Sequence, residues 1–247
     1  MSVPRSTIAC VTTLVNSATV RHLLAHAQHA HLGALLVIRG EPGVGKDTLA
    51  RLIHDTSIRR PYPFVHVNCG AQPVDRCAAD LFGHEKGVSS LATRRLLGGF
   101  ECANRGTIYL NEVEALPRTL VPDVVRVLRT GKVSRIGGSE TIDTDVRVIA
   151  STAQSAPLLG PGGFRERLRD LDVVELFVPP LRQRPEEIPA FASFFLERLS
   201  QQYRRNAQLC PEVIAAFRTQ SWPGNIRELE ETIRRLVVNG GATAPTY

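Results

Sequence analysis

Short hydrophobic runs alternate with segments of helical periodicity over the first 180 residues of the chain. The runs are rich in β-branched and aliphatic residues and are predicted as buried strands at 34–39, 64–67, 107–110, 145–151 and 173–178. Helices are predicted between them, at 45–57, 74–82, 93–104, 117–130 and 164–171. Strands that alternate with helices at this spacing predict a parallel sheet covered by helices on both faces.

The pattern changes after Pro179 and Pro180, where the strand signals stop. Three helical segments follow, each with a proline near its start, where a missing N–H removes no helical hydrogen bond. They cover residues 185–203, 211–220 and 224–239. We therefore expect an α/β domain over 1–180, a small helical domain over 181–240 and a flexible tail over 241–247.

The composition excludes several classes of protein. Hydrophobic residues make up 43% and charged residues 22%, which is typical of a globular protein and not of a disordered chain. No apolar run approaches the roughly 18–20 residues that span a bilayer, and the first ten residues are too polar for a signal peptide. The five cysteines form no CxxC pair, which disfavours zinc and a disulfide framework and favours a reducing, cytoplasmic setting.

The basic balance of the chain, with a formal net charge of +6, does not by itself indicate nucleic acid. Of the 30 basic residues only three are lysines, and the arginines are spread along the chain instead of forming a run. This distribution indicates that most of the basic residues are solvated at the surface and that a few arginines bind anions. It does not favour a DNA-binding surface.

A phosphate-binding loop follows the first predicted strand directly. Its sequence fits GxxxxGK between a buried strand and a helix, the context in which glycine N–H groups and a helix N-terminus bind phosphate. Lys46 is expected to reach the β- and γ-phosphates. Asp47 stands where the strict pattern has Ser or Thr, and Thr48 follows one residue later. The predicted nucleotide-binding residues of this loop are Gly40, Gly43, Val44, Gly45, Lys46, Asp47 and Thr48.

A second part of a nucleotide site follows the strand at 107–110. The pair at its end is Asn111 and Glu112, where an acidic pair is expected. Glu112 is the candidate for polarising an attacking water. Asn111 and Asp47 are the candidate Mg²⁺ ligands, and a neutral amide holds the ion less strongly than a carboxylate. Binding of ATP is therefore better supported than its hydrolysis.

Several longer segments together carry a resemblance to a known family. They are GEPGVGKD, FVHVNCGA, DLFGHEKG, GGFECANRGTIYLNEV, DVRVIAST, PPLRQRPEEIP and WPGNIRELE. Over roughly residues 14–240 the chain resembles the central AAA+ ATPase domain of bacterial enhancer-binding proteins, which activate sigma-54 RNA polymerase. The resemblance implies an AAA+ P-loop fold with a parallel sheet flanked by helices and a small helical lid. It also implies bound ATP and Mg²⁺, with Asp47 in a position where the family commonly has Glu.

The resemblance assigns roles to four further residues. Asn68 resembles the switch residue that holds the catalytic Glu when γ-phosphate is absent. Thr152 lies in the first sensor segment, and Arg227 resembles the second sensor, which reaches from the lid to the γ-phosphate. Arg165 resembles the first of two arginine fingers that act on a neighbouring subunit in a ring. The second finger falls in a shortened stretch, where Arg169 is one candidate and loss of the position to Asp170 is the other.

The loop that contacts sigma-54 in the family departs from its GAFTGA pattern. Here residues Gly87–Ala92 read GVSSLA, so Ser89 replaces the aromatic residue and Leu91 the second glycine. Serine cannot supply the large buried area of an aromatic anchor. Together with Asn111 and the finger region, this loop favours a changed mechanism. No DNA-binding domain is expected in this stretch of sequence.

Three functions remain open from the sequence. The first is an ATP-binding AAA+ module of a transcriptional regulator, which forms a homo- or hetero-oligomeric ring, hydrolyses ATP weakly and has RNA polymerase or a sigma factor as its partner. The second is a non-hydrolysing module that binds an effector such as cyclic di-GMP through Arg21, Arg39 and Arg51 and acts without sigma-54. The third is a remodelling ATPase of another AAA+ branch, which the FGHEKG and WPGNIREL segments disfavour.

Overall fold

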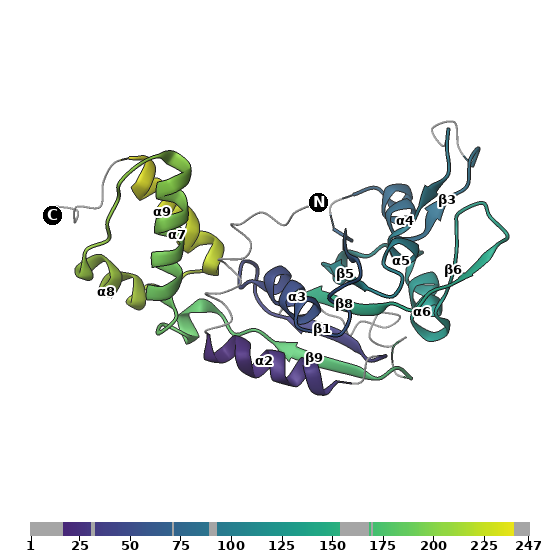
Figure 1. Cartoon of the computed structure of the whole chain (residues 1–247), viewed down its shortest axis with the longest axis horizontal. Helices are drawn as coiled ribbons and strands as arrows, with labels where there is room; N and C mark the ends of the chain where they lie inside the picture. The colour runs from purple at the N-terminus through teal and green to yellow at the C-terminus, as the bar shows by residue number, and fades with distance from the viewer. Residues whose placement is uncertain are drawn as a thin grey trace. The chain divides into compact units, whose positions relative to one another are not determined.

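The computed structural model describes residues 17–30, 33–70, 72–88, 93–153, 168 and 170–239. These residues form two compact units, which we describe separately (Figure 1). The sheet unit contains the described residues of 24–39 and 49–177, and the helical unit contains those of 17–23, 40–48 and 178–239. The phosphate loop, residues 40–48, therefore belongs to the same compact unit as the C-terminal helices.

A five-stranded parallel sheet forms the centre of the sheet unit and confirms the strands predicted from the sequence. Its order is β2 (Phe64–Asn68), β5 (Thr107–Asn111), β8 (Arg147–Thr152), β1 (Leu35–Arg39) and β9 (Val173–Phe177). Asn68 is paired in register with Asn111, and Arg39 with Thr152. The register brings the predicted site residues Asn68, Asn111 and Thr152 to the carboxyl edge of the sheet, the edge that binds ligands in α/β proteins.

Helices cover both faces of the sheet, because alternate strand residues point to opposite sides. On one face α4 (Val74–Phe82), α5 (Gly99–Cys102) and α6 (Val121–Thr130) bury a core with Val37, Ile108 and Ala150. On the other face lie α2 (Ala18–His29) and α3 (Lys46–Asp55). His54 of α3 is hydrogen-bonded to Thr107 (2.9 Å), and Arg147 donates to the Ala27 carbonyl of α2 (2.9 Å). Burial lowers the pKa of His54 below its ordinary value.

Two short hairpins correct the sequence prediction. The helix expected at 93–104 is wrong over most of its length: β4 (Leu96–Leu97) pairs antiparallel with β3 (Gly83–His84), and only Gly99–Cys102 is helical. Gly98 lies so close to β3 that a Cβ there would be 2.2 Å from the Phe82 carbonyl carbon. A second hairpin, β6 (Lys132–Ser134) and β7 (Thr141–Asp143), follows α6 and was not predicted.

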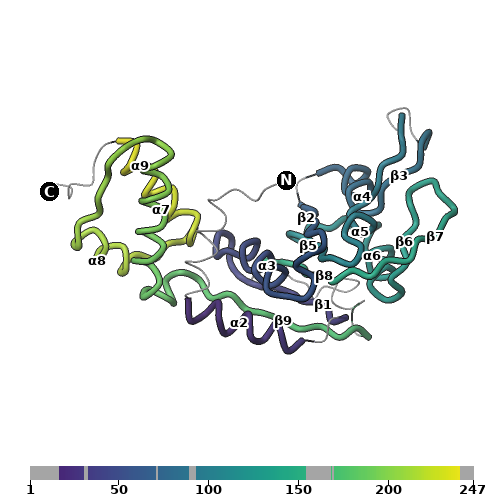
Figure 2. Tube along the Cα trace, viewed as in Figure 1, coloured from purple at the N-terminus to yellow at the C-terminus, as the bar shows by residue number. Residues whose placement is uncertain are grey.

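The two hairpins lie side by side, as Figures 1 and 2 show, and an arginine joins them. Arg135, 6% exposed, forms ion pairs with Glu85 (2.7 Å), with Glu101 (2.7 Å) and with Glu140 (3.4 Å). The two closer carboxylates raise the pKa of Arg135 above its ordinary value. Residues far apart in sequence thus hold the base of the contact loop, Gly87–Ala92, whose residues 89–92 lie outside the described structure.

The helical unit confirms the three predicted C-terminal helices. They are α7 (Ile188–Tyr203), α8 (Pro211–Thr219) and α9 (Asn225–Val238), which Figure 2 shows packed together. Their core contains Phe191, Phe195, Leu229 and Ile233, and Trp222 packs edge-on against Phe217. A short 3-10 turn, η3 (Leu181–Gln183), precedes α7, and another, η1 (Val113–Ala115), follows β5 in the sheet unit. The domain boundary predicted at residue 180 stays a prediction.

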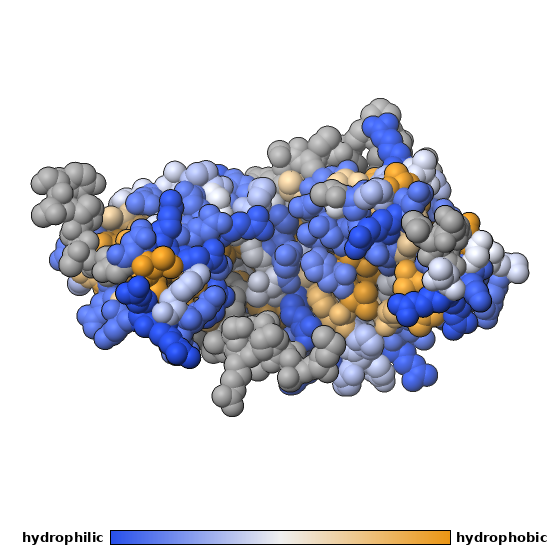
Figure 3. Space-filling view, turned by 90° about the horizontal axis from the view of Figure 1, so that it is seen from above, coloured by the Kyte–Doolittle hydropathy of each residue, from blue (hydrophilic) through white to orange (hydrophobic). Residues whose placement is uncertain are grey.

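Other expectations can be compared with the described residues. The helix predicted at 117–130 begins only at Val121, and the one at 164–171 lies largely outside the described structure. The four described cysteines are free thiols. Among the described residues no helix is long and apolar enough to cross a membrane. On the face in Figure 3, hydrophobic residues form separate patches among polar side chains.

Candidate functional site

The phosphate loop leaves the end of β1 and turns twice with positive φ angles before α3. Gly43 has φ of +78° and Gly45 has φ of +98°, a region of backbone conformation that favours glycine. Lys46, the first residue of α3, donates from Nζ to the carbonyl oxygens of Gly40 (2.8 Å) and Glu41 (3.1 Å). The ammonium group therefore lies over the start of its own loop, and its contact with a phosphate stays a prediction.

Within the helical unit, the phosphate loop packs directly against the start of α9. The Ile226 N–H donates to the Gly43 carbonyl (3.0 Å), and the Asn225 amide donates to the Pro42 carbonyl (3.0 Å). A Cβ at Gly43 would lie only 2.3 Å from the Gly224 carbonyl oxygen. Glycine at this position is therefore required both by the backbone angle and by the contact with the segment that carries the predicted second sensor.

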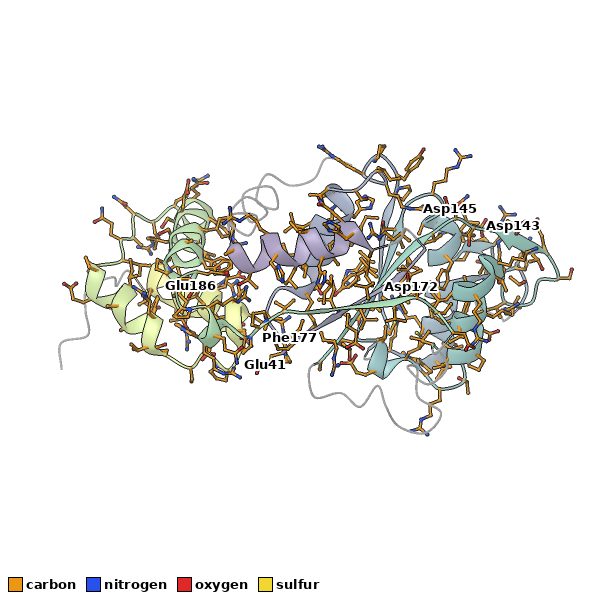
Figure 4. The ribbon with its side chains drawn as sticks, turned by 90° about the horizontal axis from the view of Figure 1, so that it is seen from below. Glu41, Asp143, Asp145, Asp172, Phe177 and Glu186 are labelled. Carbon is orange, nitrogen blue, oxygen red and sulfur yellow. The ribbon has the colours of Figure 1, made fainter. Side chains whose placement is uncertain are left out.

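Glu41 is the electrostatic centre of this contact (Figure 4). Its carboxylate accepts two hydrogen bonds from the Arg182 guanidinium, at 2.6 and 2.9 Å, and one from the Asn225 amide at 3.1 Å. The hydrogen bonds from Arg182, followed by that from Asn225, lower the pKa of Glu41 to about 2. The carboxylate is therefore charged at any pH at which the protein is expected to work.

A buried arginine, Arg184, is hydrogen-bonded to the backbone of the phosphate loop. Arg184 is 1% exposed and donates to the Val44 carbonyl (2.9 Å) and to the Glu187 carboxylate (3.1 Å). Glu187 also accepts a hydrogen bond from the Ser17 hydroxyl. Burial lowers the pKa of Arg184, and the Glu187 charge opposes that effect. This pair, which sequence reasoning missed, lies in the PPLRQRPEEIP segment.

The other loop residues and the predicted second sensor, Arg227, differ in how exposed they are. Val44 is buried, Thr48 is half-buried, and Asp47 is exposed in the first turn of α3. Arg227 is also exposed, and a Cβ at Gly43 would lie 3.3 Å from the Arg227 Cβ. Among the described residues, no partner is found for the Arg227 guanidinium. The side chain thus begins beside the phosphate loop with its charge available to an anion.

In the sheet unit, Glu112 lies just beyond β5 in a left-handed conformation, with φ of 57° and ψ of 53°. Positive φ is uncommon for residues other than glycine and concentrates at functional sites. The carboxylate lies against Gly70, where a Cβ would be 2.1 Å from Glu112 Oε2 and 3.4 Å from Asn68 Oδ1. Glu112 is exposed, and its action on water stays a prediction.

Asn68 and Glu112 are neighbours that do not hydrogen-bond to each other in the described structure. Asn68 Oδ1 instead accepts a hydrogen bond from the Gly70 N–H (3.0 Å), and its backbone carbonyl accepts one from Gln72 (2.6 Å). Asn68, the predicted switch residue, and Glu112, the predicted catalytic residue, thus both lie next to Gly70. The switching role of Asn68 stays a prediction.

Asn111 lies in a cluster of hydroxyl groups that the sequence did not reveal. Its Oδ1 accepts a hydrogen bond from the Ser151 hydroxyl (2.7 Å), and the Tyr109 hydroxyl lies 2.8 Å from Ser151 Oγ. Tyr109 is 1% exposed and Ser151 is 0% exposed. Tyr109 is two residues before Asn111 and so shares its face, but only the pairing of β5 with β8 brings Ser151 to them.

The first sensor segment ends β8 beside this cluster. Thr152 is fully buried, and the next residue, Ala153, donates its N–H to Glu114 Oε1 (2.8 Å). Glu114 was not singled out from the sequence, although it lies two residues after Glu112. It fixes the chain at the point where the predicted sensor leaves the sheet.

Some predicted residues lie outside the described structure. These are Arg165, Arg169 and residues 89–92 of the contact loop. Asp170 is described and forms an ion pair with Arg129 of α6 (3.0 Å). At the base of the contact loop, Val88, Leu96 and Leu97 are exposed, with 42%, 41% and 44% of their surface accessible.

The predicted Mg²⁺ role of Asn111 does not fit its surroundings. Magnesium is bound by oxygen ligands, and the only oxygen of this carboxamide accepts hydrogen bonds inside the hydroxyl cluster. Within the described ranges, no group of three or more His, Cys, Asp and Glu side chains is arranged to hold a metal ion. Asp47 stays the one predicted ligand whose exposure suits the role.

The chain belongs to the family described as the sigma-54 interaction domain, whose profile matches residues 13–176. A second profile, described as an AAA+ ATPase lid domain, matches residues 182–244. The parallel sheet followed by a helical lid is the AAA+ fold expected from the sequence.

Relatives of known name agree with this family. The chain is 41% identical to the regulatory protein AtoC of Escherichia coli, over 83% of this chain and 45% of AtoC. It is 39% identical to a Nif-specific regulatory protein of Azorhizobium caulinodans, over 89% of this chain and 36% of that protein. A crystal structure of NtrX from Brucella abortus in complex with ATP aligns with a TM-score of 0.79 and 32% identity, covering 94% of this chain and 54% of NtrX. The chain thus spans less than half the length of these two regulatory proteins.

Proposed function

We propose that the chain is the ATP-binding AAA+ module of a bacterial transcriptional regulator of the sigma-54-dependent class. The observation that carries this proposal is the packing of the phosphate loop against the start of the lid. Gly43, Asn225 and Glu41 fix the loop, Lys46 lies over it, and the Arg227 charge is available beside it. An NtrX structure with ATP bound supports the choice of nucleotide.

The remaining roles follow the family. Lys46 and the glycine N–H groups bind the phosphates, Thr152 and Arg227 sense them, and Glu112 polarises water with Asn68 as its switch. Arg165 acts on the nucleotide of a neighbouring subunit in a ring. We expect hydrolysis to be weak, because Asn111 replaces a carboxylate, and we assign no step to Mg²⁺ through that residue.

A titration tests nucleotide binding. ATP and ADP are titrated into the wild-type chain and into Lys46→Ala, with heat as the readout. We expect binding by the wild type and a loss of at least about tenfold in affinity for the variant, since one charge-assisted phosphate contact is removed. Equal affinities, or no heat with either protein, contradict the proposal.

The partner is proposed to be sigma-54 RNA polymerase, in the cytoplasm, with the contact loop on the β3–β4 hairpin as the contacting element. Support comes from the family and from the exposed apolar residues Val88, Leu96 and Leu97 at the base of that loop. Because Ser89 lacks the area of an aromatic anchor, we expect weak capture of sigma-54 that Ser89→Phe strengthens. Equal capture by the two proteins contradicts this assignment.

The alternative, an effector module that binds cyclic di-GMP through Arg21, Arg39 and Arg51, gains no support. In the structure Arg39 pairs with Glu175 (3.1 Å), and Arg51 pairs with Asp55 (3.0 Å). Both arginines therefore have structural partners. The relatives reported above are all regulators whose names mention no such effector.

A further inference from the structure

We propose that Cys69 and Cys77 are a modification site at which hydrogen peroxide forms a reversible disulfide, and that this bond links the end of β2 to α4. Both residues belong to the sheet unit, so the site lies within one compact unit. The inference goes beyond the proposed ATP binding, because neither thiol is assigned a role with the nucleotide.

The two cysteines lie on elements that pack against each other, β2 and α4 (Figure 2). Cys69 directly follows β2, and its N–H donates to the Asn111 carbonyl (2.9 Å), which continues the pairing of β2 with β5. Cys77 is the fourth residue of α4, and its N–H donates to the Pro73 carbonyl (3.0 Å). The backbone at both cysteines is therefore held by secondary structure.

The two thiols meet in the core of the sheet unit. Cys69 is 2% exposed and Cys77 is 0% exposed, and both belong to the hydrophobic cluster that α4 helps to bury. The Cys69 thiol donates a hydrogen bond to the Cys77 sulfur. A disulfide forms between cysteines whose Cβ atoms lie within about 4.5 Å. Since these side chains are already in contact, the bond needs only a local movement.

The two thiols differ in how readily they lose a proton. The hydrogen bond with Cys69 lowers the pKa of Cys77; burial opposes this effect, and a hydrogen bond with the Gln72 side chain adds to it. The hydrogen bond with Cys77 raises the pKa of Cys69, and burial and the charges of Glu114 and Glu112 act in the same direction. The thiolate is the nucleophilic form of cysteine. Cys77 therefore reacts with the peroxide first, and Cys69 reacts second.

The reaction has two steps, in which the sulfur atoms give two electrons to the peroxide. The Cys77 thiolate attacks one oxygen, the O–O bond breaks, and a sulfenic acid forms while the other oxygen leaves as hydroxide. The Cys69 sulfur then attacks the sulfenic sulfur, the S–S bond forms, and the second oxygen leaves as hydroxide. The two thiol protons convert both hydroxides to water. A small thiol such as glutathione reverses the reaction by thiol–disulfide exchange.

Burial restricts which oxidants reach the two thiols. Hydrogen peroxide is uncharged and scarcely larger than water, so local opening of the structure admits it more readily than a bulky reagent. Disulfides that form in a reducing compartment are usually transient and redox-sensing, which is the kind of bond proposed here.

The disulfide would alter the segment that carries the predicted switch residue. Cys69 lies between Asn68 and Gly70, and Gly70 lies so close to Glu112 that a Cβ there would be 2.1 Å from Oε2. Bonded sulfur atoms are about 2 Å apart, closer than the sulfur atoms of two hydrogen-bonded thiols. The backbone at Cys69 or Cys77 must therefore move when the bond forms. A movement at Cys69 changes the contact between Gly70 and Glu112.

Peptide mapping tests the bond directly in the wild-type chain. Trypsin cuts after Arg76, so Cys69 and Cys77 fall in different peptides that only a disulfide joins. The native chain is treated with hydrogen peroxide, unfolded with N-ethylmaleimide to block the remaining thiols, and digested without reductant. We expect the Cys69–Cys77 peptide pair to be at least about tenfold more abundant than any other linked pair, because a disulfide requires neighbouring Cβ atoms. Dithiothreitol should abolish the pair.

Three variants complete the test. Cys102→Ser is the matched control: Cys102 is an exposed thiol of the same unit, and its removal should leave the linked pair unchanged. Cys69→Ala removes the second thiol, so dimedone added with the denaturant should label Cys77 as a sulfenic acid. In Cys77→Ala we expect at least about tenfold less label on Cys69, since its thiol keeps its proton. The peptide map of the wild type does not depend on how well the variants fold.

Three results overturn the inference. In the first, a peroxide concentration that oxidises Cys102 leaves Cys69 and Cys77 fully alkylated. In the second, Cys69 is joined mainly to a cysteine other than Cys77. In the third, Cys69 and Cys77 take up equal label in the two alanine variants. Failure of the proposed ATP binding is distinguishable, because the linked pair is detected without nucleotide.

Discussion

The side-chain amide of Asn225 donates to the carboxylate of Glu41 at 3.1 Å, and so joins the start of α9 to the phosphate loop inside the helical unit. The same side chain accepts the Leu181 N–H at Oδ1 (2.8 Å) and is fully buried. One residue of the lid thus fixes both the loop and the segment that leads to α7. The GNIREL segment, residues 224–229, therefore stabilises the fold of the helical unit in addition to any role in sensing phosphate.

Replacing Asn225 with alanine should destabilise the protein by about 2–4 kcal/mol, because buried partners lose their hydrogen bonds and φ of 53° becomes unfavourable. Chemical denaturation measures the loss. Asn225→Gly separates the two causes, since glycine tolerates this angle and restores no hydrogen bond. If Asn225→Gly is as stable as the wild type, the hydrogen bonds contribute nothing.

The low pKa of Glu41 predicts a dependence of stability on pH. A carboxyl whose pKa is about 2 in the folded state and near 4.5 unfolded stabilises the protein at pH above 4.5, and loses that contribution as the pH falls toward 2. At neutral pH we expect about 1 kcal/mol, because Glu41 and Arg182 are partly exposed. The measurement is the difference in unfolding free energy between wild type and Glu41→Gln from pH 7 to pH 3. A difference that stays constant or grows on acidification contradicts the assignment.

The buried ion pair of Arg184 and Glu187 predicts that neutralising Glu187 destabilises the protein more than neutralising the neighbouring Glu186. Glu187→Gln leaves the buried Arg184 charge without the carboxylate that is hydrogen-bonded to it, which should cost about 3 kcal/mol of unfolding free energy. Glu186→Gln is the comparison, because Glu186 is exposed one residue earlier and acts on Arg184 through its charge alone (Figure 4). It should change stability by less than about 0.5 kcal/mol. Equal effects of the two variants would show that Arg184 does not depend on this partner.

Two glycines with positive φ predict different outcomes for the same substitution. Gly43→Ala places a Cβ at φ of +78° and 2.3 Å from the Gly224 carbonyl, whereas Gly87→Ala, at φ of +88°, meets no atom within 4 Å. We expect Gly87→Ala to cost about 1 kcal/mol of backbone strain. Gly43→Ala should cost several kcal/mol and weaken ATP binding, since the loop must move. Thermal unfolding and an ATP titration compare them, and an unchanged affinity of Gly43→Ala contradicts the proposed packing.

The strands and the phosphate loop could be predicted because each carries a local signal. Buried parallel strands are continuous apolar runs, and the loop has glycines at fixed spacing. The β3–β4 and β6–β7 hairpins have no such signal, because strands of two or three residues show no periodicity. They depend on Arg135, whose carboxylate partners lie 50, 34 and 5 residues away. The hydrogen bond between Asn111 and Ser151 could likewise not be predicted, since Ser151 belongs to a neighbouring strand.

The replacement of a carboxylate by Asn111 also predicts how hydrolysis responds to mutation. Asn111→Asp restores an oxygen ligand at the end of β5, two residues from Tyr109 and next to Glu112, without changing side-chain volume. We expect ATP turnover in Mg²⁺ to rise by at least about tenfold, because a metal ion can then neutralise the developing phosphate charge. The measurement is phosphate release by wild type and variant, with Asn111→Asp in EDTA as the control. The double variant Asn111→Asp with Glu112→Gln should be inactive. If turnover does not rise, the missing carboxylate at residue 111 is not what limits hydrolysis. If the double variant is as active as Asn111→Asp, Glu112 is not the residue that polarises water.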